Sequence, residues 1–301
     1  MSSNPFAQPG RFFKGNLHTH STTSDGQLPP DEVCRRYRER GYDFICLSDH
    51  FLPVYDYPVT DTRPYRTDGF TTLLGAEVHV PSTSLGEKWH LLANGLPLDF
   101  EPTLEGETAP ALAARCAAAG AFVSIVHPAW YSLSVDDART IDSAHAVEVY
   151  NHTSQVKTDR GDGTVLLDQL LADGWRLNAL ACDDAHFEAD DAFGAWVMVK
   201  ANERDPDALL QALKHGHYYS STGAEIHDIQ LDGDDLVVNC SPASAVFLQG
   251  KGSRATQVLG QGLTNVRLPA HKLGKTSFLR VTVVDAQGRR AWSNPFWRDE
   301  A

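Results

Sequence analysis

Short apolar runs alternate with amphipathic stretches over the first two thirds of the chain. Runs typical of strands cover residues 12–18, 44–47, 73–80, 90–94, 122–126, 147–150, 177–181 and 195–199. Helical patterns lie between them, in PPDEVCRRYRERG, ALAARCAAAG, VLLDQLLADG and PDALLQALKHG, and several end at a glycine typical of a helix C-cap. This alternation predicts an α/β fold built on a parallel sheet or a barrel.

The pattern changes after residue 223. Short β-like runs at 226–231, 236–240, 245–248, 264–268, 278–285 and 289–292 are separated by turn signals, and no helical period appears. We therefore expect one domain over residues 1–223 and a small antiparallel β-sandwich over residues 224–301.

Composition narrows the classes of partner. The 301 residues include 39 acidic and 26 basic side chains, for a formal charge of −13, and a field of this sign repels polyanions. We expect no nucleic-acid polymer and no membrane as partner. No apolar run approaches the roughly 18 residues of a membrane span, and no secretion signal is evident, which predicts a cytoplasmic protein. The five cysteines have no CxxC spacing, which predicts reduced, buried thiols.

Histidines and carboxylates gather at the ends of the predicted strands. His18 and His20 follow the first strand, and residues two apart in an extended segment point to the same side. The later strand ends carry Asp49-His50, Glu77 with His79, His90, His127 and Asp183-Asp184 with His186. Because the carboxyl ends of barrel strands converge on one face, these side chains are expected to share one site.

The donor types indicate metal binding. Imidazole and carboxylate ligands without cysteine favour Zn²⁺, Mn²⁺ or Fe²⁺. The set is too large for one tetrahedral ion, so we expect two to three divalent ions, which can activate a hydroxide and hold an anionic substrate. The chain contains no GxxxxGK[ST], GxGxxG or GxSxG motif, which argues against nucleotide-driven work, hydride transfer and serine hydrolysis.

Four sequence blocks resemble one known family. LHTHSTTSDG, LSDH, IVHP and CDDAH, with Glu77 and His90 between the second and third, resemble the PHP (polymerase and histidinol phosphatase) superfamily of metal-dependent phosphoesterases. The resemblance spans about residues 14–223 and implies a distorted (β/α)7 TIM-like barrel, the PHP fold, with a trinuclear metal centre. YYSSTGAEIHDIQL and AWSNPF are similar to the branch with carbamate-hydrolase-like metallohydrolases, in which a small β domain follows the barrel.

The resemblance also implies a role for individual side chains. The ligands of a first ion would be His18, His20, Glu77 and Asp184. The ligands of a second ion would be Glu77, as a bridge, with His90 and His127. The ligands of a third ion would be Asp25, His50 and His186, with Asp25 standing where some relatives have a histidine. The side chains that hold the attacking hydroxide, and so act in catalysis, would be His18, His20, Glu77, His127 and Asp184.

Other polar residues lie beside these candidates. Asp49 and Asp183 are adjacent to ligands, and we expect them to orient ligand imidazoles. Guanidinium groups in the polar loops can pair with a phosphate bidentately, and Arg63 and Lys157 lie in the same loops. The side chains expected to contact substrate are His79, Asn151, His152, Arg66 and Arg160.

Together these features predict a hydrolase that cleaves a small phosphomonoester or nucleotide with a metal-bridging hydroxide at a trinuclear centre. One alternative is hydrolysis of a carbamate or carboxylic ester at the same centre. Another is a non-catalytic, metal-stabilised binding protein. The partner expected is a small anionic substrate; the leaving group, the native metal, the oligomeric state and the role of the C-terminal β region stay open.

Overall fold

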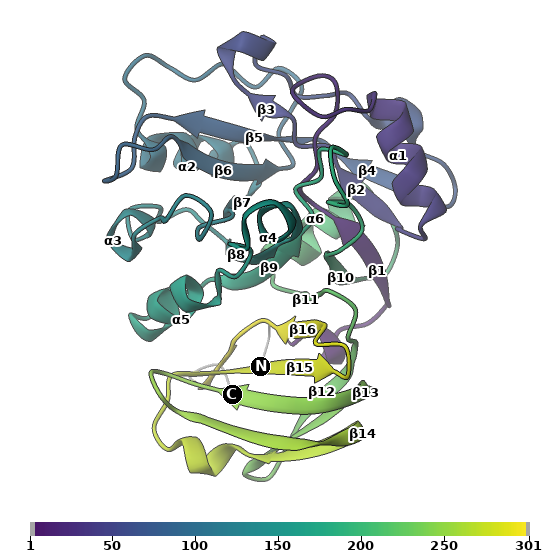
Figure 1. The fold of residues 1–301 in the computed structure, drawn as a ribbon, viewed down its shortest axis with the longest axis vertical. Coiled ribbons are helices and arrows are strands. Elements are labelled where there is room, and N and C mark those ends of the chain that lie inside the picture. The colour runs from purple at the N-terminus through teal and green to yellow at the C-terminus, as the bar shows by residue number, and fades with distance from the viewer. Residues whose placement is uncertain (1–3, 299–301) are drawn as a thin grey trace.

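The computed structural model describes residues 4–298 and has a mixed α/β fold with few helices (Figure 1). The α-helices in this range are α1 (Pro30–Glu39), α2 (Ala109–Ala118), α3 (Val135–Ala138), α4 (His152–Thr158), α5 (Thr164–Ala172) and α6 (Pro206–Lys214). Short 3-10 turns are η1 (Pro5–Ala7), η2 (Pro53–Tyr55), η3 (Arg63–Tyr65) and η4 (Ala270–Leu273). The four predicted helical patterns correspond to α1, α2, α5 and α6, whereas α3 and α4 were not predicted.

The smaller of two sheets has six strands in the order β3-β5-β6-β7-β8-β9. Their bounds are β3 (His50–Phe51), β5 (Gly75–Val80), β6 (Trp89–Asn94), β7 (Phe122–Ile125), β8 (Ala146–Asn151) and β9 (Asn178–Cys182). All pairs are parallel except those of β6, which runs antiparallel to β5 and β7. Because β6 is reversed, its first residues lie at the same edge as the last residues of β7.

The larger sheet has eleven strands, in the order β12-β13-β15-β16-β11-β10-β1-β2-β4, with β14 paired to β13 and β17 to β15. Their bounds are β1 (Arg11–Asn16), β2 (Phe44–Cys46), β4 (Thr71–Leu73), β10 (Trp196–Ala201), β11 (Tyr218–Ser221), β12 (Ile226–Asp232), β13 (Asp235–Gln249), β14 (Ala255–Pro269), β15 (Phe278–Asp285), β16 (Arg290–Ser293) and β17 (Phe296–Trp297).

The strand predicted over residues 73–80 is two strands in different sheets. β4 ends at Leu73 in the larger sheet, and β5 begins at Gly75 in the smaller one. A Cβ at Gly75 would lie 2.6 Å from Sγ of Cys46 and 2.7 Å from the carbonyl oxygen of Ala93. Only glycine lets the chain pass this closely as it changes sheets.

The expected closed barrel is not formed by residues 4–298, because the strands make two separate sheets. β1 pairs in parallel with β2 on one side and antiparallel with β10 on the other, so it has no free edge for β9. The sheets meet through backbone hydrogen bonds just beyond the strand ends. His20 N donates to the carbonyl oxygen of Ala185 at 2.9 Å, and Asp184 N donates to that of His18 at 2.8 Å.

Apolar side chains fill the space between the two sheets. One buried cluster contains Phe13 and Phe44 of the larger sheet together with Leu92 and Phe122 of the smaller sheet. A second cluster lies on the other face of the smaller sheet, where α2 and α5 cover it. All five cysteines are buried and free, as predicted. None of the helices within residues 4–298 is long and apolar enough to cross a membrane.

Strands β12 to β17 are paired antiparallel and enclose an apolar core of their own. The two strands predicted at 236–240 and 245–248 are a single strand, β13, whose register shifts around Pro242. Proline fits there because a bulge needs no ladder donor. These strands also continue the larger sheet through β16 and β11. The boundary predicted at residue 223 lies between β11 and β12, and the division into two domains stays a prediction. The C-terminal strands form the lower part of Figure 1.

Buried polar contacts join this C-terminal β region to the rest of the fold. Asn294 is 2% exposed, and its side chain accepts from Ala179 N and donates to the carbonyl oxygens of Gly216 and Tyr218. On another strand, the buried guanidinium of Arg280 forms two 2.7 Å hydrogen bonds to the Asp168 carboxylate on α5. Removal of the C-terminal β region would therefore leave these buried polar groups in the rest of the fold without partners.

Replacing Asn294 with alanine should destabilise the whole fold. The substitution leaves three buried backbone groups without their partner, which costs about 2–4 kcal/mol of unfolding free energy. Urea unfolding followed by circular dichroism measures the change. Asn265→Ala is the matched control, because Asn265 is exposed and bonds only to the Asn239 side chain. Equal stability of the two variants would contradict this account of the contact.

Candidate metal centre

Loops and strand ends from both sheets bring the predicted ligands together. His18 and His20 follow β1, His50 opens β3, His127 follows β7, and Asp184 follows β9. His18, His20 and Asp184 lie where backbone hydrogen bonds join the two sheets. The nine side chains predicted as ligands fall into overlapping groups of closely spaced donor atoms, and these are His18, His20, Asp25, His50, Glu77, His90, His127, Asp184 and His186.

Glu77 lies at the centre of the cluster. It is fully buried, and its Oε1 atom lies 2.8 Å from His90 Nδ1 and 2.9 Å from His127 Nε2. Its Oε2 atom lies 2.7 Å from His50 Nδ1 and 3.7 Å from Nε2 of both His18 and His20. Nε2 of His79 lies 3.8 Å from Oε2 as well, so one carboxylate meets six imidazoles, with two on one oxygen and four on the other.

Asp184 closes the group around the HxH motif. Its Oδ1 atom lies 2.9 Å from His20 Nε2 and 3.2 Å from His18 Nε2. Asp184 has φ of 60° and His127 has φ of 30°. This left-handed backbone is costly for residues other than glycine and concentrates at functional sites. The strain turns the Asp184 and His127 side chains into the cluster.

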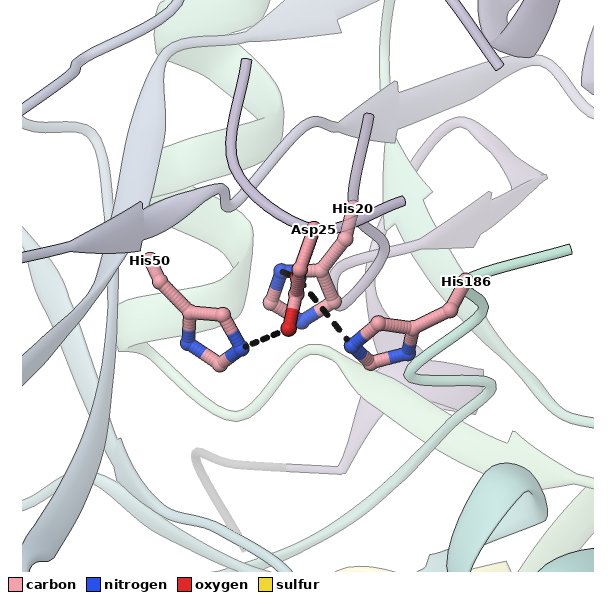
Figure 2. Close-up of side chains that lie close together, drawn as sticks. All are labelled: His20, Asp25, His50 and His186. Atoms are coloured by element: carbon pink, nitrogen blue, oxygen red, sulfur yellow. Dashed lines mark ion pairs between the residues drawn. The ribbon is translucent and has the colours of Figure 1, made fainter. Parts of the chain in front are cut away.

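A third group surrounds Asp25. Figure 2 shows the imidazoles of His20, His50 and His186 arranged around its carboxylate. The distances are 3.3 Å from His50 Nε2, 3.4 Å from His186 Nε2 and 4.0 Å from His20 Nδ1. His20 therefore stands between this group and the group at Asp184.

The cluster fits divalent cations. Nε2 of His18 and Nδ1 of His20 are buried and have no hydrogen-bond partner within residues 4–298, and Oε2 of Glu77 makes no well-aligned hydrogen bond there although Nδ1 of His50 lies 2.7 Å away. Buried polar atoms are nearly always paired, so several unpaired lone pairs in one place call for a positive ion. Imidazole and carboxylate donors suit Zn²⁺, Mn²⁺ and Fe²⁺.

Burial and charge divide the histidines into two protonation classes. Burial lowers the pKa of His20 to about 4 and also lowers the pKa of His90, so both rings are neutral at pH 7. Burial also opposes protonation of His50, but the carboxylates of Glu77 and Asp25 outweigh it and raise the pKa of His50 to about 10. A neutral ring offers a lone pair at once, whereas His50 must first lose a proton.

A buried acid that the sequence did not reveal supports the cluster. Glu148, on β8, lies with Oε1 3.2 Å from Nδ1 of His18, and its Oε2 accepts from His127 N at 2.7 Å and from Asn151 Nδ2 at 2.9 Å. The available signal was a lone charge inside the apolar run AVEVYN. Glu148 accepts from Nδ1 of His18, and this contact orients the ring so that Nε2 faces Glu77 and Asp184.

The two acids expected to orient ligand imidazoles hold loops instead. Asp49 accepts from the backbone and hydroxyl of Ser21 and from the hydroxyls of Ser24 and Thr60. The carboxylate of Asp183 accepts from the hydroxyl of Tyr37 and from the backbone N–H groups of residues 193–195. Both acids alternate with ligands along the chain, so their side chains face away from the cluster.

His79 orients His50. Its Nδ1 lies 3.1 Å from the carbonyl oxygen of Trp89, which only accepts, so Nδ1 carries the proton. Burial lowers the pKa of His79 well below its usual value, and its free Nε2 therefore accepts from Nδ1 of His50 at 2.9 Å. Nε2 of His50 is thereby directed toward Asp25.

A cavity of about 250 Å³ opens beside the cluster. Its walls are candidate ligands on one side and, on the other, Trp130, Thr153, Ser154, Lys157, Thr158 and Glu188. Of these, only Lys157 lies among the charged loop residues noted in the sequence. A lone tryptophan or threonine in a loop carries no signal of its own.

The five side chains expected to contact substrate lie outside this cavity. His79 is buried behind His50, and Asn151 is engaged with Glu148 and Asp184. His152 lines a different groove, beside Trp292 of the C-terminal β region. Arg66 bonds to the carbonyl oxygen of Thr72, and Arg160 to that of Trp130.

Replacing Glu148 with glutamine should weaken metal binding about 10- to 100-fold, because a lost partner of a ligand imidazole has effects of this size. The amide keeps the shape but places an N–H group against a donor of His127 or Asn151. Equilibrium dialysis with metal analysis measures the affinity. Glu105→Gln, at an exposed position, is the control and should bind like the parent protein. Equal affinities for the two variants would exclude the proposed support.

Metal binding at pH 7 should release protons. With a pKa of about 10, His50 carries two ring protons in the metal-free protein, and ligation requires one to leave. Apparent affinity should therefore rise as pH increases toward 10 and fall as pH decreases. Calorimetry in two buffers of different ionisation enthalpy measures the protons released. His50→Gln should release about one proton fewer; identical heats in both buffers for the parent protein would refute the assignment.

Comparison with solved structures finds a protein of similar fold, although no family model and no curated protein sequence matches the chain. One match is a two-domain protein from Bacteroides vulgatus ATCC 8482 containing a predicted PHP-like metal-dependent phosphoesterase. It aligns with a TM-score of 0.54 and 16% identity over 92% of this chain and 93% of that chain.

Two further matches are partial. A protein from Bifidobacterium adolescentis ATCC 15703, provisionally named a metal-dependent phosphoesterase, has a TM-score of 0.44 and 16% identity, covering 59% of this chain and 90% of that one. An amidohydrolase from Chromobacterium violaceum has a TM-score of 0.43 and 16% identity, covering 59% and 89%. At such identities likeness concerns fold alone. The chain therefore has the fold of the two-domain PHP-like protein, as the four sequence blocks predicted.

Proposed function

We propose that this protein is a metal-dependent hydrolase that cleaves small phosphate monoesters. The observation that carries the proposal is the position of Glu77, a buried carboxylate with imidazoles on both oxygens and unpaired lone pairs around it. A carboxylate in this position suits a bridge between two cations.

In this proposal two to three divalent ions, Zn²⁺, Mn²⁺ or Fe²⁺, bind at three neighbouring positions. The first would use His18, His20, Glu77 and Asp184. The second would use Glu77, His90 and His127. The third would use Asp25, His50 and His186. Closely spaced donor atoms of His18, His20 and Glu77, of Glu77, His90 and His127, and of Asp25, His50 and His186 support this division. Asp184 groups with His18 and His127, and His20 also lies close to the Asp25 group.

When bound, such ions supply Lewis-acid polarisation of a phosphoryl oxygen and lower the pKa of a water molecule. The chain's own residues prepare the site for that chemistry. Glu148 and His79 orient the rings of His18 and His50. The ring of Trp130 lies edge-on against His90 and His127, with centroids 5.5 and 5.3 Å apart, and limits the access of bulk water to that side.

The cavity favours a small anion. Its volume of about 250 Å³ is below the 300–1,000 Å³ usual for drug-sized ligands. Bound ions dominate the local charge of such a site, and Lys157 adds a further positive charge at the rim. The formal charge of −13 meanwhile discourages long polyanions elsewhere on the surface. These features support a small phosphomonoester over a nucleic-acid polymer.

Glu77→Gln should remove both metal and phosphatase activity. The substitution takes away the charge that both of the first two ions would share, so metal content should fall by more than one ion per chain. Metal analysis by mass spectrometry and turnover of a chromogenic phosphate ester measure the two effects. Glu87→Gln, at an exposed position, is the matched control. Full metal content in Glu77→Gln would overturn the bridge.

A parallel assay on an aryl carbamate tests the main alternative. The proposal requires turnover of the phosphate ester by the metal-loaded protein. Carbamate turnover with phosphate turnover at background would replace it with a carbamate hydrolase. No turnover on a broad ester panel by fully loaded protein would leave a metal-stabilised binding protein.

A further inference from the structure

The wall of the cavity opposite the ligands has two chemically different ends. At one end Trp130 is 40% exposed and its ring packs against His90 and His127. At the other end Lys157 pairs with Glu188, which lies two residues beyond His186. A substrate in this cavity meets an aromatic surface on one side and a cation on the other.

The backbone of Trp130, at the aromatic end, is held by two hydrogen bonds. The carbonyl oxygen of Trp130 accepts from Nη1 of Arg160 at 3.2 Å, and the Trp130 backbone N–H donates to the carbonyl oxygen of His127 at 3.0 Å. An exposed tryptophan held in this way offers a flat face at low entropic cost, and such faces favour stacking with another ring.

Lys157, at the cationic end, forms an exposed ion pair with Glu188 that a ligand can replace. Nζ of Lys157 lies 2.5 Å from Oε2 of Glu188, with side chains 34% and 45% exposed. Exposed ion pairs contribute little to stability, so Lys157 can leave Glu188 at small cost. Gln27 also donates to Glu188, at 3.3 Å, and holds the carboxylate when the lysine departs. A phosphate oxygen is a stronger partner for the ammonium group than a solvated carboxylate.

We propose that Trp130 and Lys157 determine substrate specificity and select phosphate monoesters with a single aromatic ring as the leaving group. This inference rests on the proposed function. The ring stacks on Trp130, while Lys157 binds a non-bridging phosphate oxygen near Asp25 and His186. Because the cavity holds only about 250 Å³, one ring with its phosphate fills it, and a full nucleotide does not fit.

The chemistry balances without a further reactant. Water forms a new P–O bond and releases a proton to solvent, the P–O bond to the ring oxygen breaks, and that oxygen leaves with the bonding electron pair and takes up a proton from solvent. An aryl oxide is a stable leaving anion. Accordingly, the Trp130 end of the cavity needs no acidic side chain to protonate it.

Two phosphonates that the enzyme cannot hydrolyse test the inference through binding alone. Calorimetry on the metal-loaded full chain compares phenylphosphonate with methylphosphonate, which share the anionic group and differ in the ring. We expect phenylphosphonate to bind about tenfold more tightly. Trp130→Ala should reduce this ratio to near one, and Trp130→Phe should restore most of it. Metal content, measured for each variant, should equal that of the parent.

Substitution of Lys157 should change the affinity for both phosphonates but not the ratio between them. Lys157→Gln should weaken both phosphonates about tenfold or more and leave their ratio unchanged, because both share the anionic group. Glu188→Gln should tighten both, since it frees Lys157 and removes a repelling charge. Leu104→Ala and Lys272→Ala, at exposed positions outside the cavity, are the controls.

The outcomes separate this inference from the proposed function. A parent ratio of one, or a ratio that Trp130→Ala does not change, overturns the aromatic preference even if phosphate esters are hydrolysed. Failure of Lys157→Gln to weaken either phosphonate overturns the role of the lysine. Absence of phosphate ester turnover, with the predicted binding ratios intact, overturns the proposed reaction and leaves the binding preference standing.

Discussion

The burial of one carboxylate among six imidazoles is the constraint on which the structure depends. Glu77 is fully buried, and its two oxygens meet rings from the segments after β1 and β7 and from strands β3, β5 and β6. A buried charge is tolerated only if it is paired, so these segments must converge. The imidazoles outweigh the effect of burial and hold the pKa of Glu77 well below its ordinary value. The segments that carry these imidazoles are therefore held in place by the buried charge of Glu77 as well as by the apolar clusters.

This convergence explains how two open sheets can build a site expected of a barrel. Backbone hydrogen bonds run from Asp184 and Ala185 to the HxH segment, from Ser48 to Thr19, and from Glu77 to Ser48. They join the carboxyl ends of the central strands, although the strands themselves do not pair around a full circle. The metal centre requires the two sheets to be joined only at the end where the candidate ligands lie. At the other end β1 pairs with β10 and gives the larger sheet its length.

Much of the ligand set could be predicted because several members stand at or just beyond a strand end, where periodicity and polarity change together. His18, His20 and Asp184 are examples. The supporting residues could not be predicted in the same way. Glu148 lies within an apolar strand, and its role depends on the approach of His18, which is 130 residues away. The break at Gly75 depends on contact with Cys46, and the direction of His152 depends on packing against Gly194. Tertiary proximity of this kind leaves no local pattern.

The continuity of the larger sheet has a consequence for how substrates enter. Strands β16, β11, β10 and β1 are hydrogen-bonded in one sheet, so the ladder of the C-terminal β region continues into β1, the strand that precedes His18 and His20. Many enzymes with two domains open and close by rotating about a hinge between them. Here rotation would break ladder hydrogen bonds and the buried contacts of Asn294. For the proposed hydrolase, access to the cavity would therefore depend on the side chains at its rim and not on rotation about a hinge.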